Sequence, residues 1–256
     1  MISIFEYVGG IILGLFYETG RIFLFFLEAV KMSLIPPFRI KLIFKQIEFI
    51  GINSILVVIL TGTFTGMVFA FQSYIGFSKF GAEHMVGTVV ALGMARELGP
   101  VLSSIMVTAR AGSAITAEIG TMRVTEQIDA LQALSVEPIQ YLVSPRIIAG
   151  IIIMPLLDVL AVFCGILGGY LVSVKLLNIN KYLYLDGIYQ FTELADVFNG
   201  MIKATVFGFI LTLVGAYKGY YTGGGAEGVG RSTTQSVVMS CVLILIFDYL
   251  LTALMF

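Results

Sequence analysis

The sequence predicts an all-α integral membrane protein, with an N-terminal interfacial helix followed by five transmembrane helices. The chain is 58% hydrophobic and 12% charged, whereas soluble domains carry roughly 25% charged residues. A chain this apolar must face lipid over much of its surface. Its charge-free runs are long enough to cross a hydrocarbon core of roughly 30 Å. Its Lys and Arg residues also divide unevenly between the two sides of the predicted spans.

The N-terminal segment, residues 1–48, differs from the rest of the chain. Its longest uncharged run covers residues 7–17, which is too short to cross a membrane. The pair Pro36–Pro37 then breaks the segment before three basic residues, Arg39, Lys41 and Lys45. We interpret this segment as a helix that lies in or dips into the membrane interface, followed by an elbow. A sixth full span is the alternative.

The remainder, residues 49–256, forms the predicted transmembrane domain. The first span is entirely uncharged and would be about 45 Å long as a helix, so it must tilt or project from the membrane. The four later spans are each interrupted by charged residues, by proline or by both. The five predicted spans cover residues 49–78, 85–108, 147–174, 197–217 and 232–256.

The basic residues predict the orientation of the chain. With five spans and a cytoplasmic N-terminus, ten of the 15 Lys and Arg residues lie on the cytoplasmic side and three on the other, while two lie within spans. This arrangement places the segment between the second and third spans in the cytoplasm. It places the C-terminus in the periplasm, if the membrane is a bacterial inner membrane.

Ionisable residues inside the spans are the candidate functional residues. Each costs about 2.5–3.5 kcal/mol on insertion scales, so it normally faces a cavity, a partner or another charge. Arg96 and Glu97 stand near the middle of the second span, directly before the helix-disturbing pair Gly99–Pro100. A broken helix with adjacent charges is typical of a substrate site or a gate, and an ion pair that joins helices is the alternative.

Two further charges lie in the fourth and fifth spans, namely Lys203 and Asp248. They are expected to pair with each other or with Glu97 and Arg96. We expect Lys203 to face a cavity, where its ammonium group could meet a lipid phosphate.

The segment 118–134, between the second and third spans, predicts an amphipathic helix. Val124, Ile128 and Leu131 recur at helical spacing, with polar residues on the other faces. We interpret it as a docking helix that transmits movement from a motor subunit; a connector resting on lipid is the alternative. Its candidate contact residues are Glu118, Arg123, Glu126, Gln127, Asp129 and Leu131.

Other sequence patterns give weaker evidence of function. Residues 225–232 fit a phosphate-loop pattern with Arg231 in place of lysine, but a membrane helix precedes them, where a phosphate loop follows a strand. The GxxxG run from Gly62 to Gly66 permits close helix contact, within the chain or in a dimer. Neither metal-ligand spacing nor a catalytic residue set occurs, which argues against an intramembrane enzyme.

Several motifs together resemble the MlaE/YrbE-type permeases of ABC transporters, which work with Mce-domain proteins. The resemblance covers about residues 40–256. The motif residues are the runs 96–100 (RELGP), 109–114 (ARAGSA), 117–122 (AEIGTM), 126–127 (EQ), 144–146 (SPR) and 251–256 (LTALMF).

The resemblance implies an inner-membrane homodimer that moves phospholipids or other lipids between the inner membrane and the outer envelope. It further implies two cytoplasmic ATPase subunits, a periplasmic Mce-domain hexamer and, in many systems, a small STAS-domain protein. Residues 118–134 would match the coupling helix, and Arg96, Glu97 and Lys203 would match polar positions near the lipid cavity. We expect no cofactor in this chain, because ATP and magnesium would bind the partner ATPase. A membrane scaffold that anchors the ATPase and the Mce ring, without forming the lipid pathway, is the alternative.

Overall fold

The computed structural model describes the backbone of residues 2–255 and, in the first helix, the side chains of residues 9, 13, 17 and 19 onward. Phe256, at which the fifth span was predicted to end, lies outside the described residues. The described chain consists of helices joined by short connections and contains no strand. The predicted all-α fold class is therefore confirmed.

The helices follow one another closely along residues 2–255. The α-helices are α1 (Ile2–Leu34), α2 (Ile40–Ile50), α3 (Ile55–Ser78), α4 (Val86–Gly93), α5 (Gly99–Val107), α6 (Ser113–Val124), α7 (Gln127–Ala133), α8 (Ser144–Tyr170), α9 (Lys181–Phe191), α10 (Leu194–Tyr220) and α11 (Gly225–Met255). The short 3₁₀ turns are η1 (Ile52–Ser54) and η2 (Glu83–Met85), and the π-helical turns are η3 (Met94–Leu98), η4 (Thr108–Gly112), η5 (Ile139–Val143) and η6 (Leu171–Leu176).

Five helical stretches in the described residues are long and apolar enough to cross a membrane, which is the predicted number. These stretches are longer than the spans predicted from uncharged runs, because each helix continues through charged residues beyond its apolar part. The stretches are Ile40–Ser78, Glu83–Val124, Ile139–Leu176, Leu194–Tyr220 and Gly225–Met255.

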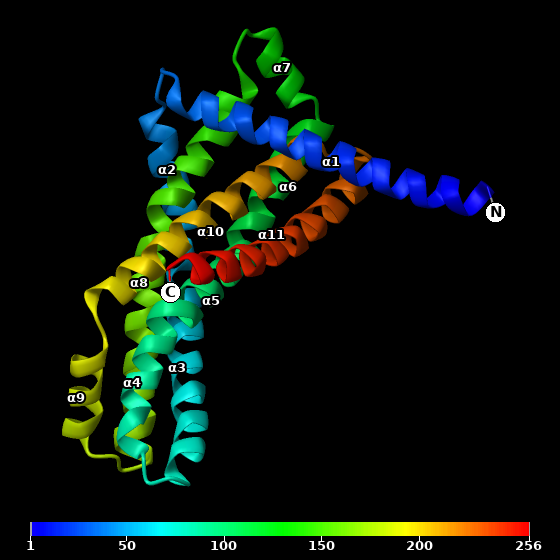
Figure 1. The fold of residues 1–256 in the computed structure, drawn as a ribbon. Coiled ribbons are helices and arrows are strands. Elements are labelled where there is room, and N and C mark those ends of the chain that lie inside the picture. Colours follow the sequence, from blue (N-terminus) through cyan, green and yellow to red (C-terminus); the bar gives the residue numbers. More distant parts are fainter. Residues whose placement is uncertain (1, 256) are drawn as a thin grey trace.

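The spanning helices form a bundle, and different short helices and connections lie at its two ends (Figure 1). The helix α8 lies at the centre, where it packs along α3 and α10 and also contacts α2 and α5. The helix α7 and the connection between α1 and α2 lie at one end of the bundle. The helix α9 and the connection between α3 and α4 lie at the other end.

Glycines allow α3 and α8 to pack closely. A Cβ atom added to Gly66 would overlap the backbone of Gly165, and one added to Gly62 would approach the carbonyl oxygen of Ala161 to 2.6 Å. The GxxxG run of α3 therefore faces α8 of the same chain and brings the two backbones together. Of the two contacts that the sequence permitted, the structure shows the intramolecular one.

The helix α1 crosses the end of the bundle near α7 and packs against α8, α10 and η5 (Figure 1). Its Phe25 is buried against the rings of Tyr217, Tyr220 and Tyr221. The guanidinium of Arg21 lies 4.2 Å from the centroid of the Tyr221 ring. The predicted break at Pro36–Pro37 is present, since α1 ends at Leu34 and α2 begins at Ile40.

The segment between the second and third spans forms two helices rather than the single helix predicted over residues 118–134. The helix α6 ends at Val124, and α7 begins at Gln127 after a left-handed residue, Glu126, with φ of 60°. A left-handed residue ends an α-helix, because the chain leaves the right-handed helical path. The side chain of Arg123 bridges the turn to Asp129, with Nη1 and Oδ1 2.6 Å apart.

Candidate functional site: a charged network at the break in the second span

The second span is not broken at the predicted position: its helix continues there and changes only its winding. The residues Met94–Leu98 form the π-helical turn η3, and α5 starts directly after it with Gly99 and Pro100. A proline at position 100 lacks the N–H that an α-helix would direct to the carbonyl oxygen of Arg96. That oxygen instead accepts a hydrogen bond from the Lys203 ammonium group, at 2.9 Å. π-Helical turns of this kind occur frequently at functional sites.

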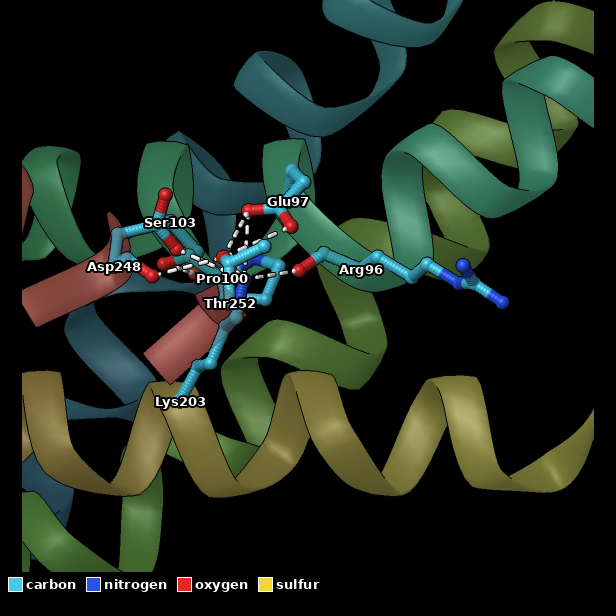
Figure 2. A network of polar contacts seen from close by, with 7 residues as sticks. All are labelled: Arg96, Glu97, Pro100, Ser103, Lys203, Asp248 and Thr252. Atoms are coloured by element: carbon cyan, nitrogen blue, oxygen red, sulfur yellow. Dashed lines mark hydrogen bonds and ion pairs between the residues drawn. The ribbon is translucent and has the colours of Figure 1, made fainter. Parts of the chain in front are cut away.

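Lys203 is the centre of a polar network that joins three spans (Figure 2). Its Nζ atom lies 2.7 Å from Glu97 Oε2 and 3.1 Å from Asp248 Oδ1. It also donates to the hydroxyl oxygen of Thr252, at 2.7 Å. The Thr252 hydroxyl in turn reaches Glu97 Oε1 and the carbonyl oxygen of Asp248, at 3.1 and 2.8 Å. The network therefore ties η3 to α10 and to the C-terminal part of α11.

The members of this network differ in exposure. The side chain of Lys203 is fully buried, that of Asp248 is 19% exposed and that of Glu97 is 38% exposed. In the described single chain, two carboxylates, a hydroxyl and a carbonyl surround the ammonium group of Lys203. That Lys203 faces a lipid cavity in the assembled permease stays a prediction. Glu97 is the member that opens the network to the surface.

Arg96 points away from this network (Figure 2). Its Nη2 and Nε atoms each lie 2.7 Å from Asp196 Oδ1 near the start of α10. Asp196 is buried, and its other oxygen accepts the backbone N–H of Glu193 in a capping box. Adjacent helix residues point in directions about 100° apart, which is why Arg96 and Glu97 find separate partners.

Asp158 of α8 lies behind the π-helical turn η3. It is buried, and its two carboxylate oxygens lie close to the backbones of Gly99 and Gly200, where a Cβ would come within 2.9 and 3.3 Å of them. Its Oδ1 atom has no hydrogen-bond partner among the described residues. Packing therefore requires a glycine at position 99, because a side chain there would collide with Asp158 and Val162.

A shallow apolar pocket lies beside this turn. Leu98, the residue after Glu97, forms one wall of the pocket, and α3 forms the other. The pocket has a volume of about 440 Å³ and is lined by Phe64, Thr65, Val68, Phe69, Gln72 and Leu98. The π-helical turn thus carries a charged network and an apolar surface on successive residues.

Some of the candidate coupling residues form ion pairs within the chain, and others make none with the described residues. Glu118 pairs with the buried Arg146, with Oε2 and Nη2 2.7 Å apart, and Arg123 pairs with Asp129. Glu126 and Gln127 are exposed at the turn between α6 and α7, whereas Leu131 is half-buried. Glu126 and Gln127 are therefore accessible to a partner, as are the exposed carboxylates of Glu118 and Asp129.

Two members of the site were not among the candidates from sequence. Asp196 lies in the first turn of α10, three residues after the N-cap residue Glu193, and this acidic pair at capping-box spacing could have identified it. Thr252 lies one helical turn after Asp248, so its position on the same face of α11 could also have been inferred.

Five helices long and apolar enough to cross a membrane, with a charged network at a π-helical turn of the second, have the architecture of a polytopic membrane protein. The family model of the MlaE permease matches residues 43–254. The chain therefore belongs to the MlaE permease family of ABC transporters, and the resemblance inferred from the motifs is confirmed.

Similar proteins agree with this assignment. The chain is 51% identical over 239 residues to a probable ABC transporter permease protein of Rickettsia typhi, covering 93% of this chain and 92% of the relative. It is 42% identical over 241 residues to a probable ABC transporter permease protein of Synechocystis, covering 94% and 89%. It is 38% identical over 216 residues to the intermembrane phospholipid transport system permease protein MlaE of Haemophilus influenzae, covering 84% and 83%.

Proposed function

We propose that this chain moves phospholipid, or a related lipid, between the inner membrane and the outer envelope, as the permease subunit of an ABC transporter. The network of Glu97, Lys203 and Asp248 at the π-helical turn η3 carries this proposal. Charges at membrane depth normally mark a substrate pathway, and a phospholipid headgroup is the charged part of a lipid. The printed name of the Haemophilus influenzae relative also supports a phospholipid as the cargo.

The exposure of Glu97 supports a specific role for this residue. Its carboxylate holds the outer position next to Lys203, where an incoming phosphate would bind. Lys203 already faces two carboxylates, so a phosphate can bind there only if Glu97 swings outward. The lipid phosphate then replaces Glu97 as the partner of Lys203, and release of the lipid restores the original ion pair. The apolar pocket beside Leu98 would accommodate part of an acyl chain.

The partners in this proposal follow from the family and from the exposed surfaces. Two copies of the permease assemble, and the apolar face of α11, which is largely exposed in the single chain, is available for that contact. Two ATPase subunits bind at the α7 end and supply ATP hydrolysis with magnesium. A periplasmic Mce-domain hexamer receives or delivers lipid at the other end, and a small STAS-domain protein accompanies the complex. The α7 end is then cytoplasmic and the C-terminus periplasmic, in the inner membrane.

A reconstituted complex tests the role of Glu97. We expect Glu97→Gln to lower lipid delivery several-fold at normal abundance of folded permease, because a neutral amide cannot restore the ion pair with Lys203 and so cannot drive release of the bound phosphate. The matched control is Glu48→Gln on α2, where the exposed side chain makes no ion pair with a described residue. If Glu97→Gln and Arg96→Gln both deliver lipid at the normal rate, the network is not on the pathway, and the scaffold alternative gains support.

A further inference from the structure

The elbow between α1 and α2 is held in place by two consecutive residues of η5. The amide nitrogen of Gln140 donates to the carbonyl oxygen of Ile35, at 2.8 Å. The guanidinium of Arg39 lies 4.5 Å from the centroid of the Tyr141 ring. Contacts between residues about a hundred positions apart fix the elbow to the body of the protein, so that Arg39 is positioned before any ligand arrives.

An open pocket of about 470 Å³ lies at this elbow. Its lining combines two cations with apolar and aromatic side chains: Phe38, Arg39, Ile40, Lys41, Leu42 and Tyr141. The network around Lys203 lies elsewhere, between η3, α10 and α11. The elbow pocket is therefore a separate site on the molecule.

The cations at the elbow have no carboxylate partner in the described part of the chain. The side chains of Arg39 and Lys41 make neither an ion pair nor a hydrogen bond with a described residue, and the Nε atom of Arg39 is buried without an acceptor. Lys45 follows Lys41 by one helical turn on the same face of α2. The acidic residues nearest in sequence to the two lining segments, Glu28, Glu48 and Glu137, are exposed and form no ion pair with these cations. The pocket thus carries an uncompensated positive charge.

Large apolar side chains are exposed next to these cations. Phe38 is 55% exposed, Ile40 is 60% exposed and Phe44, on the next turn of α2, is 67% exposed. Cationic and apolar groups side by side at the end of a span are typical of the boundary between headgroups and acyl chains. The occupant must therefore combine a negative charge with an apolar body.

We propose that the elbow pocket binds an anionic phospholipid from the leaflet at the α7 end, as a resident lipid that is not the transported one. The planar guanidinium of Arg39 donates two parallel hydrogen bonds to the phosphate, and Lys41 supplies a second cation. The side chains of Phe38 and Ile40 contact the glycerol and upper acyl region. The amine of a zwitterionic headgroup would find no carboxylate in the pocket, so the site selects an anionic lipid.

Native mass spectrometry of the full-length purified permease tests this site. The protein is incubated with phosphatidylglycerol or with phosphatidylcholine, and the retained lipid is counted. We expect Arg39→Gln combined with Lys41→Gln to lower retention of phosphatidylglycerol about tenfold and to leave phosphatidylcholine unchanged. The control pair, Lys175→Gln with Lys181→Gln, lies in η6 and α9 and should change neither.

Three further variants separate binding from folding. Tyr141→Phe keeps the ring beneath Arg39 and should retain the lipid, whereas Tyr141→Leu removes the ring and should lose it. Lys41 is exposed, so Lys41→Gln alone leaves the fold intact and should still reduce retention several-fold. Unchanged retention in Lys41→Gln and in the double variant would overturn the proposal, as would displacement of the lipid by millimolar inorganic phosphate. Normal lipid transport by the double variant would leave the proposed function standing.

Discussion

Lys203 illustrates how a buried charge is accommodated in this chain. Its ammonium group has three hydrogens and finds four oxygen atoms within hydrogen-bond distance, two of them from carboxylates. A buried ion pair adds little net stability, but removal of one partner leaves the other buried and uncompensated. Lys203 is therefore required for the fold as well as for the proposed pathway.

Replacement of Lys203 tests this dual requirement. We expect Lys203→Ala to lower the free energy of unfolding by about 3–5 kcal/mol, because Glu97 and Asp248 are left facing each other. Thermal unfolding of the purified permease measures the change. Lys175→Ala, on an exposed side chain, is the control.

A compensating variant distinguishes charge from packing. Lys203→Met combined with Glu97→Gln and Asp248→Asn removes the surplus charge and should recover a large part of the lost stability. Equal stability of Lys203→Ala and the unmodified protein would contradict the ion-pair explanation.

At the residue level, the sequence identified the charges but not their pairing. Arg96, Glu97, Lys203 and Asp248 stand out because each interrupts an apolar run. Their partners depend on the rotation and tilt of three helices, which the sequence pattern does not specify. Of the pairings that the sequence left open, Lys203 pairs with both Asp248 and Glu97, whereas Arg96 reaches Asp196 at the start of another span.

The close contact between α3 and α8 requires glycine at the contact positions of α3. We expect Gly66→Ala to destabilise the protein by about 1–3 kcal/mol, because the added methyl group would overlap the backbone of α8 at Gly165. Gly76→Ala on the same helix is the matched control, because no described atom outside its own stretch of helix lies within 4 Å of the added Cβ. Thermal unfolding of the two variants should differ; equal midpoints would show that α3 and α8 can separate without cost.

The turn between α6 and α7 presents Glu126 and Gln127 to a partner. We expect Glu126→Lys to reduce co-purification of the ATPase several-fold while the permease still inserts, because the residue is exposed and makes no ion pair with a described residue. Glu83→Lys, at the opposite end of the molecule, should leave the complex intact. Undiminished ATPase binding in Glu126→Lys would show that the turn is only a connector.

The break at Glu126 could not be predicted from the sequence, and the reason is physical. Neither glycine nor proline marks the position, and the apolar spacing from Val124 to Leu131 continues across it. The left-handed conformation is maintained by contacts across the turn, namely the Arg123–Asp129 ion pair and the hydrogen bond from Gln127 to Thr125. Such contacts depend on the chain having already turned.

On the scale of the whole molecule, five spans place the two ends of the transmembrane domain on opposite sides of the membrane. We expect a C-terminal reporter that is active only in the periplasm to give a signal, and one attached within the α6–α7 turn to give none. A cytoplasmic signal from the C-terminus would require α1 to cross the membrane as well. The number of spans was predictable because hydrocarbon thickness sets a minimum apolar length. The packing of α8 at the centre was not, because apolar character does not distinguish a central helix from a lipid-facing one: the two most apolar stretches contain the central α8 and the largely exposed α11.

The π-helical turns have a consequence for the alignment of the second span. Each such turn holds one residue more than an α-helical turn, and one residue corresponds to a rotation of about 100° around the axis. The second span contains two such turns, η3 and η4, between α4 and α6. Relative to an uninterrupted α-helix, the packing face of α6 is therefore rotated twice by this amount from that of α4. Deletion of a single residue in η3 would therefore turn α4 and α5 relative to each other by about a quarter of a circle. The number of residues in η3 therefore fixes the relative rotation of the flanking helices. A substitution in this turn should be better tolerated than the insertion or deletion of a residue.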